Sequence, residues 1–100
     1  MKIIFIDKIH PYLKEKIEEA HHKCDTAYKK NKSEIEQIIH KYDGIIIRSR
    51  FNLDKKFLTK ATKLKFIARA GSGLENINVS YAETRNIKIY NAAEGNKQAV

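Results

Sequence analysis

The stretch Gly44-Ile45-Ile46-Ile47-Arg48-Ser49-Arg50 joins a short, continuously apolar run to a polar, basic segment. Continuous rather than alternating apolarity, rich in β-branched isoleucine, is typical of a strand buried on both faces of a parallel sheet. We therefore predict a central strand over Ile45–Ile47. The charged residues that follow would then lie at the carboxyl end of this strand.

Three other runs have the same character and are also predicted to be strands buried on both faces: Ile3–Ile6, Phe66–Ala68 and Ile87–Tyr90. A weaker candidate strand covers Cys24–Tyr28.

The segments between these runs carry apolar residues at helical spacing. Pro11 suits the first turn of one helix, Ser33 and Glu36 form a capping-box pair for a second, and Asp54 can cap a third. A shorter helix is predicted over Val79–Thr84. The apolar stripes of the first three helices consist of Leu13, Ile17 and Ala20; Ile35, Ile38 and Ile39; and Phe57, Leu58 and Ala61.

Strands and helices therefore alternate along the 100 residues. This alternation predicts one α/β domain, in which helices cover both faces of a parallel sheet and the crossovers are right-handed. A flavodoxin-like strand order, 2-1-3-4-5, is the most economical arrangement. With 4 Gly and 1 Pro, we expect no linker within the chain.

The composition, 42% hydrophobic and 32% charged, is that of a soluble globular protein. No apolar run approaches the roughly 20 residues of a membrane span, and the first residues are too short an apolar run for a secretory signal. Cys24 is the single cysteine, so no disulfide framework is possible. We therefore expect a cytoplasmic protein that does not bind membranes.

The net charge of +8 raises the question of nucleic-acid binding. The lysines are spread over the whole chain, in runs of at most two, and no aromatic block is interleaved with them. We therefore expect a solvated lysine-rich surface and no nucleic-acid partner.

Arginine has a more informative distribution. Three of the four arginines follow or end a predicted strand: Arg48, Arg50 and Arg69. In open α/β sheets ligands bind at the carboxyl ends of the strands, and a planar guanidinium group suits carboxylate and phosphate. The pattern predicts an anion site at this edge. The alternative is that one or more of these arginines pair with Asp7 or Asp43 and only complete the sheet edge.

The turn Gly71-Ser72-Gly73 only partly matches a dinucleotide-binding fingerprint. Asn76 occupies its sixth position, and Asn91 stands where an acidic, ribose-binding residue would follow the next strand. We therefore do not expect this turn to bind a dinucleotide. Its backbone N–H groups could instead hold a carboxylate.

The histidines and the cysteine do not predict a metal site. His21, His22 and Cys24 resemble half of a zinc site, but no second ligand pair follows at usable spacing. His40 is expected at a helix end, where imidazole interacts favourably with the helix dipole. His10 follows the first strand and is the one histidine expected near the anion site.

Three blocks of sequence resemble a known family. Tyr42–Arg50 resembles the YDALIVRSR stretch of D-3-phosphoglycerate dehydrogenases, and Leu64–Ile77 resembles their LKVIGRAGVGVDNID segment. Asn91–Asn96 is similar to their NAPEGN segment. The blocks occur in the family's order and spacing, so the whole chain resembles the N-terminal part of a D-2-hydroxyacid dehydrogenase of this kind.

The resemblance implies two domains. Residues 1–93 would form a flavodoxin-like substrate-binding (catalytic) domain, incomplete without the rest of the chain, and residues 94–100 would begin a crossover helix to a missing Rossmann domain. That domain would bind most of the NAD, and the enzyme would transfer a hydride between NAD and an anionic D-2-hydroxy acid such as 3-phosphoglycerate. A homodimer is expected for the full-length protein.

The same resemblance implies site residues. The backbone at Ser72 and Gly73 would hold the substrate carboxylate, Arg48 and Arg50 would face its distal anionic group, and Asn96 would lie near the substrate. The family's catalytic arginine, glutamate and histidine would lie beyond the last residue of this chain. These 100 residues are therefore expected to contain no catalytic residue and to be inactive alone.

Three residues depart from the family pattern: Glu75, Asn78 and Ala93. The first two are expected to affect loop capping, and they leave open a sister enzyme that acts on another hydroxy acid. A response-regulator receiver, which shares the fold, requires an aspartate where Arg48 stands. A non-catalytic module of the same fold that binds an anion or a partner remains the alternative.

Overall fold

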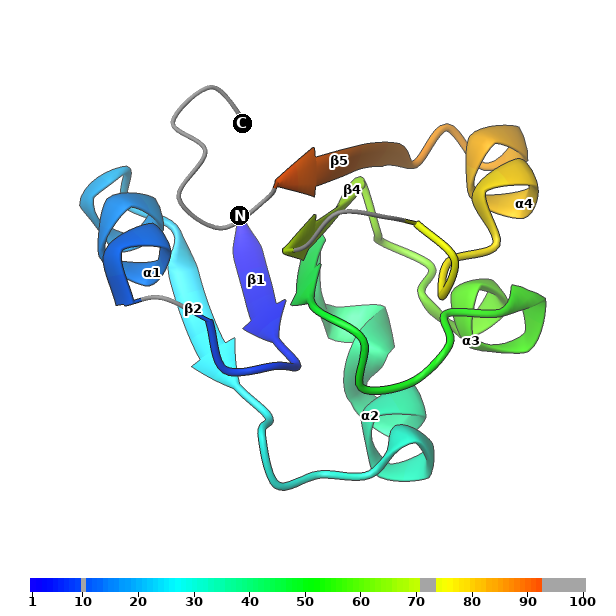
Figure 1. The fold of residues 1–100 in the computed structure, drawn as a ribbon, viewed down its shortest axis with the longest axis horizontal. Coiled ribbons are helices and arrows are strands. Elements are labelled where there is room, and N and C mark those ends of the chain that lie inside the picture. Colours follow the sequence, from blue (N-terminus) through cyan, green and yellow to red (C-terminus); the bar gives the residue numbers. More distant parts are fainter. Residues whose placement is uncertain (10, 71–73, 93–100) are drawn as a thin grey trace.

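The computed structural model describes residues 1–9, 11–70 and 74–92. Within them, parallel strands form one sheet in the order β2-β1-β3-β4-β5 (Figure 1), which confirms the predicted flavodoxin-like order. The strands are β1 (Lys2–Phe5), β2 (Lys23–Thr26), β3 (Gly44–Ile47), β4 (Phe66–Ala70) and β5 (Lys88–Ala92). The helices are α1 (Pro11–Glu19), α2 (Lys32–Ile38), α3 (Lys55–Lys60) and α4 (Val79–Thr84), with a 3-10 turn at Ile39–Lys41 after α2.

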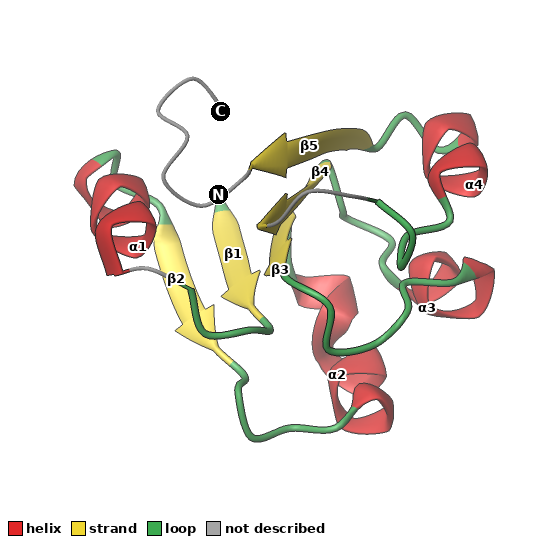
Figure 2. Cartoon of the chain, viewed as in Figure 1, coloured by secondary structure: helices red, strands yellow, loops and turns green. Residues whose placement is uncertain are grey.

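Helices lie on both faces of the sheet (Figure 2). On one face, α1 packs through Leu13 and Ile17 against the side chains of Phe5 and Ile46. On the other face, α2, α3 and α4 enclose the larger core, which contains Ile45 and its strand neighbours. Continuous apolarity in β1 and β3 is explained by this arrangement, because their alternating side chains enter two different cores.

Two helix starts follow simple capping rules, and one differs from the prediction. Asp54 caps α3 by accepting a hydrogen bond from the N–H of Phe57, as predicted. The capping box of α2 is formed by Asn31 and Glu34, so the predicted pair Ser33 and Glu36 was wrong. Asn31 lies two residues before Ser33 and precedes the same apolar stripe. Both reciprocal hydrogen bonds between Asn31 and Glu34 are made.

β5 also differs from the prediction. It was expected to be buried on both faces, but Tyr90 is 42% exposed and Ile89 is half-buried. The strand is the edge of the sheet, and it continues through Asn91 because it pairs with the whole of β4, up to Ala70 opposite Ala92. Asn91 therefore lies within the strand and not after it.

The register of the sheet brings the loops after the strands to one edge. Ile46 pairs with both Phe5 and Ala68, so β1, β3 and β4 end close to the same line. No helix among the described residues is long and apolar enough to cross a membrane.

Candidate anion-binding edge

Asp7, directly after the first buried run, holds the loop that follows β3. Its Oδ2 accepts hydrogen bonds from the backbone N–H of Arg48 at 2.6 Å and of Arg50 at 3.2 Å. The alternative that these arginines pair with Asp7 is thus met through their backbone N–H groups. The effect is to fix the backbone of the Arg48–Arg50 segment against the end of β1.

The guanidinium group of Arg50 is directed into the protein. Its Nη1 donates to the carbonyl oxygens of Ile6 at 2.9 Å and Ala27 at 2.8 Å, and its Nη2 donates to the carbonyl of Lys30. The carbonyls that follow β1 and β2 are thereby tied to the loop after β3. Arg50 has a clear structural role, and a substrate contact by this residue remains a prediction.

Arg48 and Ser49 occupy the outer part of the same loop. Arg48 is half-buried and Ser49 is exposed. The backbone carbonyl of Arg48 accepts a hydrogen bond from Asn76 at 3.2 Å. Its side chain therefore starts from a backbone that is held by Asp7 on one side and by Asn76 on the other.

Asn76 is a polar residue of the edge that sequence analysis did not assign to the site. It is 9% exposed, its Oδ1 accepts from Nε of Arg69 at 2.7 Å, and its Nδ2 donates to the carbonyls of Arg48 and Phe51, each at 3.2 Å. The available signal was a pair of amide residues, Asn76 and Asn78, on either side of Ile77 in the segment that follows β4. From the sequence, Asn76 was interpreted only as a mismatch in a glycine fingerprint.

A short backbone bridge joins the loop after β3 to the loop after β4. The N–H of Leu53 donates to the carbonyl of Asn76 at 2.7 Å, and the N–H of Asn78 donates to the carbonyl of Leu53 at 3.0 Å. The two loops therefore form one unit at the edge.

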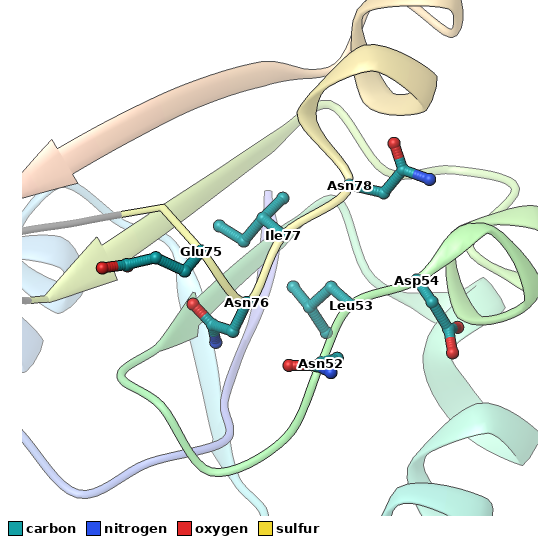
Figure 3. Close-up of a pocket in the computed structure, with 7 residues that line it drawn as sticks. All are labelled: Asn52, Leu53, Asp54, Glu75, Asn76, Ile77 and Asn78. Atoms are coloured by element: carbon teal, nitrogen blue, oxygen red, sulfur yellow. The ribbon is translucent and has the colours of Figure 1, made fainter.

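A shallow pocket of about 200 Å³ lies on this unit (Figure 3) and is lined by Asn52, Leu53, Asp54, Glu75, Asn76, Ile77 and Asn78. Figure 3 shows the carboxylates of Glu75 and Asp54 at opposite ends of the lining. Hydrogen bonds from the Phe57 N–H and from Lys32 lower the pKa of Asp54, so this carboxylate is charged at neutral pH. The lining contains two carboxylates and no cation, so the pocket does not suit an anion.

The remaining predicted site residues lie outside the described residues: Ser72, Gly73, Asn96 and His10. The part of the chain that the structure describes brings together Arg48, Arg50 and Arg69 at one edge, as predicted, with Asp7 and Asn76 between them. Cys24 is half-buried in β2, and burial raises the pKa of its thiol. Within the described ranges, no three His, Cys, Asp or Glu side chains are grouped to hold a metal ion.

Comparison with known proteins gives consistent matches. The chain is 38% identical over 66 residues to a D-3-phosphoglycerate dehydrogenase of Synechocystis, which covers 66% of this chain and 12% of that protein. It is 36% identical over 101 residues to an erythronate-4-phosphate dehydrogenase of Bacteroides thetaiotaomicron, which covers 100% of this chain and 28% of that protein. The structure of a 3-phosphoglycerate dehydrogenase from Entamoeba histolytica with bound cofactor NAD⁺ matches with a TM-score of 0.80 and 30% identity, over 91% of this chain and 32% of that chain.

The chain thus spans 12% of the length of the Synechocystis relative and 28% of the Bacteroides relative. The sequence model of the family described as D-isomer specific 2-hydroxyacid dehydrogenase, catalytic domain, matches residues 3–100. Since that match covers almost all of the chain, the protein belongs to the D-isomer specific 2-hydroxyacid dehydrogenase family.

Proposed function

We propose that the full-length protein transfers a hydride between NAD and an anionic D-2-hydroxy acid, such as 3-phosphoglycerate, and that residues 1–93 are its substrate-binding domain. The observation that carries this proposal is the Arg48 loop, fixed at the carboxyl edge of the sheet by Asp7 and Asn76 in a chain of this family. Residues 94–100 would then lead toward the cofactor domain.

The described residues do not fit NAD. Asn76 stands where a dinucleotide fingerprint needs a glycine, and its side chain is committed to three hydrogen bonds with neighbouring protein groups. We therefore assign NAD, which would exchange the hydride with the substrate, to a part of the protein beyond these residues. The task of the present residues is to bind and orient the acid.

The proposed binding role is electrostatic. Arg48, with Arg50 behind it, would attract the distal anionic group, while the backbone at Ser72 and Gly73 would hold the carboxylate and Asn96 would lie beside it. Such contacts hold the substrate in one orientation and thereby reduce the entropic part of the barrier. We also expect the full-length protein to be cytoplasmic and homodimeric, and sedimentation of the purified protein can test the dimer.

The test is an assay of the full-length protein for NAD reduction with 3-phosphoglycerate, erythronate 4-phosphate and D-lactate. We expect turnover with at least one phosphorylated acid and a lower KM for phosphorylated acids than for D-lactate. Absence of NAD reduction with every acid, in a folded protein that still binds phosphate, would favour the non-catalytic module.

Arg48→Ala is the first diagnostic variant. A lost charged hydrogen bond is worth roughly 1.5–3 kcal/mol, so we expect KM for the acid to rise about 10- to 150-fold while KM for NAD stays unchanged. The matched control is Arg85→Ala, because Arg85 binds Leu58 and Ala61 at the end of α3 and Tyr81 of α4, away from the Arg48 loop. The role of Arg48 is rejected if Arg48→Ala, like the control, leaves KM for the acid at its original value.

A further inference from the structure

Asn76 connects three parts of the candidate site through one buried amide. Its oxygen binds Arg69 of β4, and its nitrogen binds the carbonyls of Arg48 and Phe51 in the loop after β3. Its own backbone carbonyl receives the N–H of Leu53. The amide thus touches both arginine-bearing segments of the edge.

The chemistry of this position selects an amide. Nε of Arg69 requires an acceptor, whereas two carbonyl oxygens require donors, and asparagine supplies both from one short side chain. Aspartate would keep the acceptor but place a second oxygen against the carbonyls of Arg48 and Phe51. Alanine would remove the donor to two carbonyls and the acceptor of one guanidinium N–H in a site where Asn76 is 9% exposed.

We propose that Asn76 is a positioning residue, which sets the direction of the Arg48 side chain by holding the backbone of its loop and couples that loop to Arg69. This inference rests on the proposed function, because it assigns to Asn76 an effect on the affinity for the anionic acid. Asn76 itself does not contact the acid.

The first test is steady-state kinetics of the full-length enzyme with the acid for which wild type shows turnover. In Asn76→Ala and Asn76→Asp, KM for the acid rises about tenfold, which corresponds to about 1.4 kcal/mol, and kcat changes less than twofold. The matched control is Asn78→Ala. Asn78 caps α4 through the N–H of Tyr81, so its loss lowers the melting temperature but leaves KM unchanged.

A double-mutant cycle separates positioning from general destabilisation. If Asn76 acts through Arg48, Asn76→Ala raises KM less than twofold in the Arg48→Ala background, although it lowers the melting temperature equally in both backgrounds. An equal rise of KM in both backgrounds, or no rise in either, overturns the proposal.

Hydrogen exchange supplies a readout that does not depend on activity. The amides of Arg48 and Arg50 are hydrogen-bonded to Asp7, and we expect them to exchange faster in Asn76→Ala than in wild type or Asn78→Ala. Unchanged exchange overturns the positioning role even in an active enzyme. Lack of turnover in the wild type would instead refute the proposed function, and the effect on affinity would fall with it.

Discussion

Arg85 illustrates what an arginine does in this protein when it is far from the candidate site. From the end of α4 its Nη1 donates to the carbonyl of Leu58 at 2.8 Å, and its Nη2 donates to that of Ala61 at 3.1 Å. Leu58 lies in the last turn of α3 and Ala61 is its C-cap, and their carbonyls also accept the N–H groups of Ala61 and Leu64. Arg85, at the end of α4, therefore caps the C-terminal end of α3.

Arg85→Ala should lower the free energy of unfolding by about 1–2 kcal/mol, because two charged hydrogen bonds to a helix end are lost at a partly exposed position. Arg85→Lys should recover less than half of this loss, since an ammonium group does not reproduce the two-pronged geometry. Urea unfolding measures both values. A fully stable lysine variant would show that charge alone suffices at this position.

Arg50 and Arg85 also show why the positions of the arginines could be predicted from the sequence, whereas the groups that they bind could not. The reasoning that a planar guanidinium group implies an anion applies equally to a cluster of carbonyl oxygens, and both of these side chains bind carbonyls. Which acceptors converge on a side chain depends on contacts between residues far apart in the sequence. The three arginines lie at one edge, as the sequence indicated, but their contacts there required the structure, and an anion site at this edge stays a prediction.

At the scale of elements, β3 and β4 approach each other closely at Gly44. A Cβ atom at this position would overlap the ring of Phe66, which packs against Tyr90 with ring centroids 6.2 Å apart. The family segments that resemble these strands, YDALIVRSR and LKVIGRAGVGVDNID, carry alanine and valine at the two positions. In this chain a smaller residue, Gly44, is therefore paired across neighbouring strands with a larger one, Phe66.

Gly44→Ala should destabilise the protein by about 1–3 kcal/mol through overpacking, and Gly44→Ala combined with Phe66→Val should be more stable than Gly44→Ala alone. Chemical denaturation of the two single variants and the double variant measures this coupling. Additive losses would mean that the ring of Phe66 moves aside without cost. Phe66→Val alone should be destabilising, because it leaves unfilled space beside Gly44.

The helices and strands also show where local pattern is decisive. Periodicity was sufficient for α4, which was confirmed residue for residue, and for the strand order. It could not choose between Asn31 and Ser33 as the cap of α2, because each is followed three residues later by a glutamate. It also could not reveal that β5 is half exposed, since exposure depends on what covers the strand and not on its own residues.

At the scale of the whole molecule, the surface carries a large excess of positive charge. Lys and Arg number 20 against 12 Asp and Glu, which gives +8 at neutral pH, and the excess grows as carboxylates are protonated. Two carboxylates are placed where their charge supports the fold. Asp43 accepts the N–H of Lys2 at 2.9 Å and so joins the starts of β1 and β3, and Asp54 caps α3.

Acid should therefore unfold the protein for two reasons that can be separated. The Lys2 hydrogen bond lowers the pKa of Asp43 despite its burial, and the Phe57 and Lys32 bonds lower that of Asp54. A carboxyl group whose pKa is lower in the folded state stabilises the fold above its unfolded pKa of about 3.9, and this contribution is lost as the pH falls through the folded value. The melting temperature should thus fall steeply below about pH 4.

The variant Asp43→Asn should have a lower melting temperature than wild type at neutral pH, and this temperature should fall less on acidification. Added salt should relieve only the repulsion among the positive charges of the surface. Equal acid sensitivity of Asp43→Asn and wild type in high salt would show that Asp43 does not link protonation to folding.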